Sequence, residues 1–309
     1  MTVTLPTQDA SARARSVQSR EGLLFDRLFI GAGAMKAGTT WAYRMLERHP
    51  EIFFSFEKEI HYFYAAYVDR TVLSERNRMA NVRDKYLRID PERNHATGVR
   101  NRLHWAANYL DGPVDDIWYR NLFVFRRAER YAADFSNLYA LLPADGWRRI
   151  ADRVGELRVL YTMRHPVRRL WSHVKFHLEI TGQSRELERW GPEEFRDFAR
   201  RPFIWDNAEY GRALRRMRGG LPGGTLKPAF YETIHADRAG FLADVEAFLD
   251  LAPHNYPAEL IDRRVNTTAN RPMPEFFPAL FRDDFRRICG EVEAEGLVLP
   301  SSWSDIRGG

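Results

Sequence analysis

A short loop of small residues between an apolar run and a helical pattern constrains the fold of this chain more than any other feature. Residues 27–31 form the apolar run, and residues 35–41 follow with one lysine, one glycine and two threonines before an amphipathic pattern over 39–48. This order predicts a buried strand, a tight loop and a helix. The N-terminus of a helix offers unpaired N–H groups and a positive dipole end, which suit a phosphate group. We therefore predict a nucleotide-type ligand at the end of the first strand.

Apolar runs and helical patterns keep alternating along the rest of the chain. Further strands are predicted at 52–56, 131–135, 158–163 and 225–231, and helices at 72–87, 167–178, 237–251 and around 277–288. This alternation implies a three-layer α/β fold with a central, mainly parallel sheet flanked by helices. Ligands of such sheets bind beyond the carboxyl ends of the strands. We expect a disordered leader over 1–22 and a single domain over 23–309, in which the charged stretch 65–128 is an insertion.

The composition narrows the possible partners and compartments. The 309 residues carry 47 basic and 42 acidic side chains, and the two signs are interspersed, which favours a small phosphate- or sulfate-rich ligand over nucleic acid. The one cysteine, Cys289, excludes an internal disulfide and a cysteine metal site, and its helical pattern places it in the core. The sequence contains no apolar run long enough to span a membrane, so the default location is cytoplasmic. We find no cluster with metal-ligand spacing, and the oligomeric state is not predicted.

A second polar constellation follows the predicted strand 158–163. Arg164 stands at the strand end, Pro166 suits the first turn of the next helix, and Ser172 lies eight positions after Arg164. An arginine fork and a hydroxyl are chemically suited to a terminal phosphate. A basic, solvated helix start is the alternative interpretation for Arg168 and Arg169, but it does not account for the other three residues.

The first loop resembles a P-loop but orders its residues differently. In a Walker A motif the lysine follows the second glycine, whereas Lys36 here precedes Gly38, which disfavours a nucleoside triphosphate. The order Lys-x-Gly-Thr-Thr-Trp resembles the 5′-phosphosulfate loop of sulfotransferases that use 3′-phosphoadenosine 5′-phosphosulfate (PAPS). The spacing of Arg164, Pro166 and Ser172 resembles the 3′-phosphate motif of that family. The resemblance therefore implies a P-loop-like fold with a PAPS site.

A third segment, residues 57–63, is similar to the segment of carbohydrate-type and bacterial sulfotransferases that carries the proposed general base. Glu59 holds that position, and His61 lies two residues later. A carboxylate or an imidazole there would take the proton of an acceptor hydroxyl or amine. We expect aromatic neighbours to raise the pKa of Glu59 by desolvation, and His61 is the alternative base or orients the acceptor. Glu57 is interpreted as part of an exposed charged turn.

The resemblance implies in-line transfer of a sulfuryl group from PAPS to an acceptor, without a metal. Lys36 would act on the leaving group as well as bind it. The implied contacts to the 5′ end of PAPS are Lys36, Ala37, Gly38, Thr39 and Thr40, and those to its 3′-phosphate are Arg164 and Ser172. Trp41 either packs on the adenine or faces the core. Arg271, in the polar loop 263–272, is a further candidate contact.

The acceptor side is less well defined by the sequence. Phe135 occupies a place where some carbohydrate sulfotransferases carry a lysine near the sulfate, so no second catalytic lysine is expected there. The insertion is predicted to line the acceptor site with the following residues: His104, Trp105, Trp118, Tyr119 and Arg120. These suit a carbohydrate among other acceptors. Two alternatives remain, a nucleotide kinase or NTPase with a degenerate phosphate loop, and a non-catalytic nucleotide- or glycan-binding protein on the same fold.

Overall fold

A five-stranded parallel sheet organises the chain, whose computed structural model describes residues 22–262 and 271–306. The strands are β1 (Phe25–Gly31), β2 (Ile52–Phe54), β3 (Tyr131–Phe135), β4 (Val154–Met163) and β5 (Leu226–Phe230), and they lie in the order β2-β3-β1-β4-β5. Every pair of neighbouring strands is parallel. Ile30 in the central strand is opposite Asp134 of β3 and Val159 of β4. The predicted parallel sheet is therefore confirmed.

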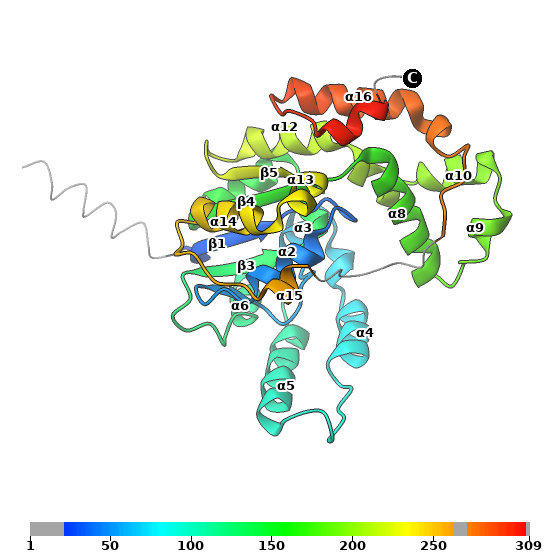
Figure 1. Cartoon of the computed structure of the whole chain (residues 1–309). Helices are drawn as coiled ribbons and strands as arrows, with labels where there is room; N and C mark the ends of the chain where they lie inside the picture. The colour runs from blue at the N-terminus through cyan, green and yellow to red at the C-terminus, as the bar shows by residue number, and fades with distance from the viewer. Residues whose placement is uncertain (1–21, 263–270, 307–309) are drawn as a thin grey trace, which may run out of the picture.

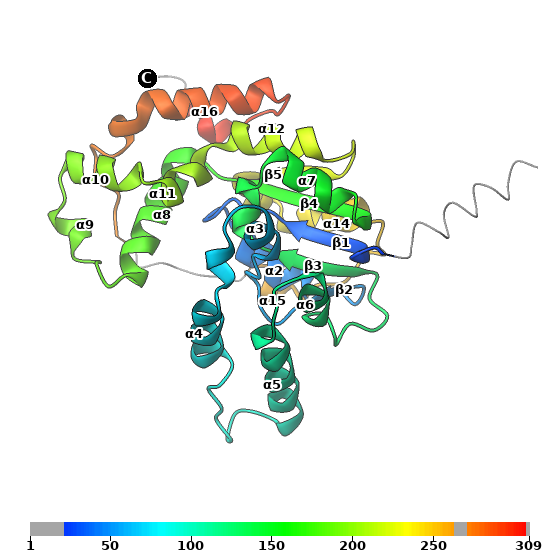
Figure 2. The ribbon, with the colours of Figure 1, turned by 180° about the vertical axis from the view of Figure 1, so that it is seen from behind.

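Helices cover both faces of the sheet and make the expected three layers (Figures 1 and 2). Side chains alternate between the two faces of a strand, so Phe29 packs in one apolar cluster while Leu28 and Ile30 pack in the other. The cluster around Phe29 includes helices α2 (Thr39–Leu46) and α14 (Arg238–Phe248). The opposite cluster includes α3 (Tyr62–Tyr67), α7 (Ala144–Ala151) and α12 (Tyr210–Gly220). The central strand is buried on both sides, which fixes the positions of the loops at its ends.

The remaining helices lie around these layers. They are α6 (Asp116–Asn121), α8 (Pro166–Ile180), α9 (Glu186–Arg189), α10 (Pro192–Ala199), α11 (Pro202–Trp205), α13 (Tyr231–Ala236), α15 (Ala258–Ile261) and α16 (Arg282–Ala294). Short 3-10 turns are η1 (Arg70–Leu73), η2 (Asn137–Leu141), η3 (Asp206–Ala208), η4 (Pro278–Phe281) and η5 (Ser301–Ile306). Cys289 of α16 is buried, as predicted.

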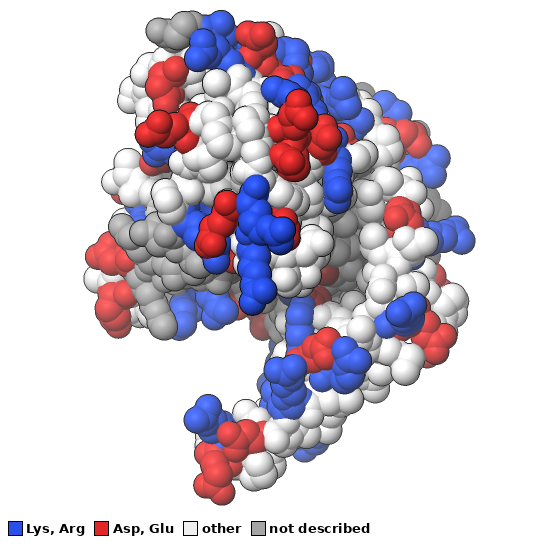
Figure 3. Space-filling model, turned by 90° about the vertical axis from the view of Figure 1, so that its right-hand side faces the viewer, with Lys and Arg blue, Asp and Glu red and all other residues white. Residues whose placement is uncertain are grey.

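Two helices, α4 (Glu75–Lys85) and α5 (Ala96–Leu110), extend from the body as an arm (Figures 1 and 2). Basic and acidic side chains are interspersed on the face of the molecule that Figure 3 shows, including the arm at its lower end. Trp105, Trp118 and Tyr119, which were expected to line the acceptor site, are at most 3% exposed. The rings of Trp105 and Trp118 pack at the base of the arm on either side of Tyr109, whereas Tyr119 packs in the body against Phe25 and Tyr62. These aromatic residues therefore serve packing, whereas His104 and Arg120 are exposed.

The structure differs from the sequence-based prediction at several boundaries. The helix predicted over 72–87 is divided into η1 and α4, which meet at Ser74. The strand predicted over 158–163 begins four residues earlier, at Val154, because its polar first half pairs with β1, where Arg27 forms an ion pair with Glu156. The predicted leader, up to residue 21, and most of the loop 263–272 lie outside the described residues. Among the described helices, none is long and apolar enough to cross a membrane.

Candidate active site

Loops from the carboxyl ends of the five strands meet at one edge of the sheet. On the β1–β4–β5 side, the guanidinium of Arg164, which follows β4, donates to the carbonyl of Lys36 in the loop after β1 at 3.2 Å. The same guanidinium lies 4.5 Å from the ring centroid of Tyr231, which follows β5. The predicted 5′- and 3′-phosphate residues Lys36 and Arg164 are thus brought into contact, as the rule for parallel sheets implies.

The loops after β2 and β3 complete the same edge. Lys58, from the loop after β2, places its Nζ 3.4 Å from the Oγ1 of Thr39 at the start of α2. Glu59, the next residue, accepts a hydrogen bond of 2.8 Å from the backbone N–H of Asn137, which follows β3. The proposed base therefore faces the phosphate loop across the strand ends, and all five loops share one site.

The phosphate loop is held in place by the neighbouring strand and by one glycine. The N–H groups of Ala32 and Ala34 donate to carbonyls of β4, at 2.9 and 2.7 Å, so the loop continues along the sheet edge. Gly38 caps α2 in the left-handed region, with φ of 87°. A Cβ at this position would lie only 2.6 Å from a ring carbon of Tyr231. Glycine is required here by both its backbone conformation and the space available.

The ammonium of Lys36 is set in a partly apolar, positively charged environment. It lies 4.2 Å from the ring centroid of Phe176 on α8. Burial and the neighbouring Arg164 lower the pKa of Lys36 below its usual value, and Lys175 and Lys58 contribute in the same direction. Like charges gathered in this way disfavour each other, and an anion among them would relieve that repulsion. The site is built to receive negative charge.

Arg164 lies between β4 and α8, and Ser172 lies within α8, as predicted. The backbone of Arg164 is held by Tyr210, whose hydroxyl donates to the Arg164 carbonyl at 2.7 Å and accepts from its N–H at 3.4 Å. The Nε of Arg164 is buried and has no hydrogen-bond partner among the described residues. Ser172 is 8% exposed and precedes Phe176 by one helical turn, so it lies on the helix face that contacts Lys36.

Glu59 is an ionised carboxylate, contrary to the expectation from its aromatic neighbours. Its Oε1 accepts a hydrogen bond of 2.7 Å from Lys58. Burial raises the pKa of Glu59, but the positive charge of Lys58 and the hydrogen bonds from Lys58 and Asn137 outweigh burial. The pKa is therefore lowered, not raised. The sequence-based argument considered only desolvation and missed the adjacent ammonium.

His61 is placed beside Glu59 by a buried polar network. Its N–H donates to the Oγ of Ser136 at 2.9 Å, and this hydroxyl donates to Asp134 at 2.7 Å. The Nε2 of His61 lies 3.7 Å from Glu59, and its Nδ1 is buried without a hydrogen-bond partner in the part of the chain that the structure describes. Burial lowers the pKa of His61, so the ring is neutral at pH 7. Both Glu59 and His61 are in a protonation state that accepts a proton.

Trp41, Arg271 and Phe135 lie outside the centre of this site. Trp41 is 3% exposed, and its Nε1 donates to the carbonyl of Ile261, which matches the core-facing alternative. Arg271 forms an ion pair of 2.6 Å with Glu188 on α9. Phe135 is 1% exposed and packs against Phe29, so its side chain points into the core rather than toward the loops.

Two site residues were missed or misinterpreted from the sequence. Glu57, expected in an exposed turn, is 5% exposed and accepts hydrogen bonds from the arm, from Lys85, Tyr86 and Asn81. Lys58 was given no role, although it contacts both Glu59 and the phosphate loop. The available signal for Lys58 was its place directly before the proposed base.

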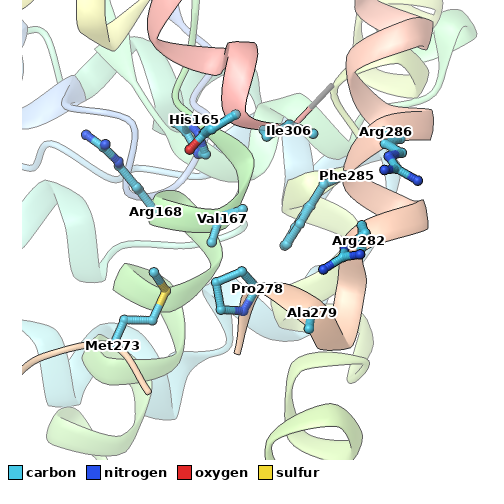
Figure 4. A pocket seen from close by; sticks show the side chains of 11 residues that line it. His165, Val167, Arg168, Met273, Pro278, Ala279, Arg282, Phe285, Arg286 and Ile306 are labelled. Carbon is cyan, nitrogen blue, oxygen red and sulfur yellow. The ribbon is translucent and has the colours of Figure 1, made fainter. Parts of the chain in front are cut away.

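A separate cavity of about 290 Å³ lies between α8 and α16 (Figure 4). Apolar side chains such as Val167 and Phe285 line it, and Arg168 points away from it in Figure 4. Lys36, Glu59 and Arg164 are not among its lining residues, so it is distinct from the strand-end site.

The comparisons with known proteins agree with this architecture. A model described as "Sulfotransferase family" matches residues 28–255. A sulfotransferase from Alicyclobacillus acidocaldarius is similar in structure, with a TM-score of 0.59 and 21% identity, over 90% of this chain and 98% of that one. The sulfotransferase domain of the Synechococcus PCC 7002 olefin synthase has a TM-score of 0.47 and 14% identity, over 89% and 96% of the two chains. No curated protein matches the chain.

Proposed function

Because the chain belongs to the sulfotransferase family, we propose that it transfers a sulfuryl group from PAPS to an acceptor hydroxyl or amine. Carbohydrates are the first acceptor class to test. The observation that carries the proposal is a chain of contacts at the strand ends, in which Lys58 contacts both Glu59 and the phosphate loop, and Arg164 contacts Lys36 of the same loop. Cations beside an ionised carboxylate suit a polyanionic donor next to a proton acceptor.

The residues of the site fit the donor chemically. Arg164 has a buried Nε without a partner in residues 22–262 and 271–306, and a phosphate oxygen is an acceptor well matched to a guanidinium fork. Gly38 precedes the start of α2, where the first N–H groups of a helix lack partners within the helix and suit a phosphate group. We propose that Ala37, Gly38, Thr39 and Thr40 hold the 5′-phosphate. Arg164 and Ser172 hold the 3′-phosphate in this proposal.

When bound, the donor supplies a sulfuryl group, whose bond to the 5′-phosphate oxygen breaks as a bond from the acceptor oxygen or nitrogen to sulfur forms. The electron pair of the broken bond leaves with adenosine 3′,5′-bisphosphate. Glu59 accepts the proton of the acceptor, and its lowered pKa keeps it ionised at neutral pH. Lys36 offsets the charge that the leaving group gains. Asn137 and Lys58 keep the Glu59 carboxylate aimed across the strand ends.

Ligand-induced stabilisation tests this proposal without knowledge of the acceptor. Adenosine 3′,5′-bisphosphate at 100 times its Kd should raise the free energy of unfolding by about 3 kcal/mol, without magnesium. Lys36→Ala should abolish transfer from PAPS to every acceptor of a panel. Lys227→Ala is the matched control, because Lys227 pairs with Asp244 away from the site. Stabilisation by ATP with magnesium alone would favour a kinase or NTPase, and binding of PAPS without any transfer would favour a non-catalytic protein.

A further inference from the structure

The ammonium of Lys58 connects the two halves of the candidate active site. Its Nζ lies 2.7 Å from the Oε1 of Glu59 and 3.4 Å from the Oγ1 of Thr39. The Lys58 side chain is only 20% exposed, so its position is restricted by its surroundings. Lys85, on the arm, forms an ion pair of the same length with Glu57 but has a 55% exposed side chain. The two lysines therefore differ in placement although each is paired with a glutamate.

The contacts of Lys58 coincide with the two ends of the proposed reaction. Thr39 belongs to the loop that holds the leaving phosphate in the proposed function, and Glu59 takes the proton of the acceptor. In an in-line displacement the transferred group lies between the leaving atom and the attacking atom. A cation within reach of both Thr39 and Glu59 therefore lies beside the transferred group.

We infer that Lys58 is a catalytic residue that binds the sulfuryl oxygens of the donor. This inference rests on the proposed function, because it concerns the same site. An ammonium carries three N–H donors. Glu59 and Thr39 account for two of these directions, which leaves a donor for a sulfuryl oxygen.

The position of Phe135 makes this assignment more specific. The ring of Phe135 packs beneath the strand ends against Phe29 and Tyr43, so residue 135 has no part in the site. Lys58 reaches the site from the neighbouring strand, since β2 pairs with β3 and its loop crosses toward α2. The chain therefore supplies its second active-site lysine from the loop that also carries the base.

A purely structural role for Lys58 predicts a different outcome. If the ammonium only held Glu59, its removal would change the acceptor step and leave donor binding unaltered. If it binds the sulfuryl group, its removal lowers the affinity for PAPS, which carries that group. The affinity for adenosine 3′,5′-bisphosphate, which lacks the group, stays unchanged. The comparison of the two nucleotides isolates the contact to the sulfuryl oxygens.

Calorimetric titration of the full chain with PAPS and with adenosine 3′,5′-bisphosphate tests the inference. In Lys58→Met, PAPS affinity should fall about 10- to 100-fold, as for loss of a hydrogen bond to a charged group. Adenosine 3′,5′-bisphosphate affinity should change by less than about threefold, and Lys58→Arg should restore part of the PAPS affinity. Lys85→Met, the matched control, should bind both nucleotides like the wild type.

The outcomes separate this inference from the proposed function. Equal losses for both nucleotides in Lys58→Met, or no loss of PAPS affinity, would overturn the role of Lys58. Lys58→Gln, which keeps a polar side chain of similar length, replaces the methionine variant if that protein melts at a lower temperature than the wild type. A wild-type protein that binds neither nucleotide would instead refute the proposed function itself.

Discussion

Replacing Gly38 by alanine tests the geometry on which the phosphate site depends. Gly38 has φ of 87°, and a non-glycine residue in the left-handed region loses about 1–2 kcal/mol. The added Cβ would lie 2.6 Å from Cδ2 and 3.0 Å from Cε2 of Tyr231. That ring is itself confined, because His235 packs on it at 4.0 Å and Arg164 at 4.5 Å. Overpacking of this kind costs about 1–3 kcal/mol.

Together these two effects should lower the free energy of unfolding of Gly38→Ala by about 2–5 kcal/mol. At about 2–4 °C for each kcal/mol in a large domain, the melting temperature should fall by about 4–20 °C. Because relief of the clash displaces Tyr231, it also moves Arg164, and the affinity for adenosine 3′,5′-bisphosphate should fall about 10-fold or more. Urea denaturation and calorimetric titration measure the two effects.

Gly290→Ala is the matched control for this substitution. Gly290 lies within α16, and a Cβ there would meet no atom within 4 Å. Alanine is favoured over glycine in a helix, so this variant should be more stable by up to about 1 kcal/mol. The double variant Gly38→Ala/Tyr231→Ala removes the clash but keeps the backbone strain. Wild-type melting and nucleotide affinity in Gly38→Ala would refute the left-handed start of α2 packed on Tyr231.

Two further predictions concern the polar groups behind the site. Burial raises the pKa of Asp134 from 3.8 to about 6. The folded state therefore favours the protonated form of Asp134. The resulting stabilisation is complete below pH 4, and the free energy of unfolding falls by ~3 kcal/mol as the pH rises through 6. Urea denaturation from pH 4 to 7 should show a flatter profile for Asp134→Asn, and equal slopes would contradict the raised pKa. Glu57→Ala removes the carboxylate that Lys85 contacts and one of the two acceptors of the Tyr86 hydroxyl, which keeps the Phe56 carbonyl. The substitution should destabilise the protein by about 1–3 kcal/mol and expose the arm to proteolysis, whereas replacing the exposed Glu75 by alanine should not. A Glu57→Ala protein that resists protease like Glu75→Ala would show that this carboxylate does not anchor the arm.

The sheet could be predicted from the sequence because its strands are short, buried apolar runs. The strand predicted at 131–135 has the same bounds in the structure, since all five of its residues are buried. The strand predicted at 158–163 was too short, because its first residues are polar on the side where they meet Arg27. An apolar run in the sequence predicts a strand only where both faces of that strand are buried. The polar first residues of a strand such as β4 are therefore missed by a search for apolar runs.

The sequence indicated that Lys36, Glu59 and Arg164 would share one edge of the sheet, because each lies within five residues of the carboxyl end of a strand. The parallel sheet brings the loops that carry them together. Residues 57–59 alternate in charge, and the sequence does not show which partner each of their side chains contacts. Glu57 bonds to the arm, Lys58 to the phosphate loop, and Glu59 to the loop after β3. These directions depend on tertiary partners that lie 19 to 78 positions away.

The clustering of cations connects the stability of this fold to its ligand. Lys36 is destabilised in its charged form by burial and by Arg164, Lys175 and Lys58, and Glu179 offsets only part of this. Such repulsion lowers the stability of the protein without an anion, and neutral side chains would pack there at less cost. An anion that brings several negative charges to the strand ends would relieve this repulsion. A donor with phosphate groups at both ends and a sulfuryl group between the lysines meets that requirement, whereas a single small anion would neutralise only part of the cluster.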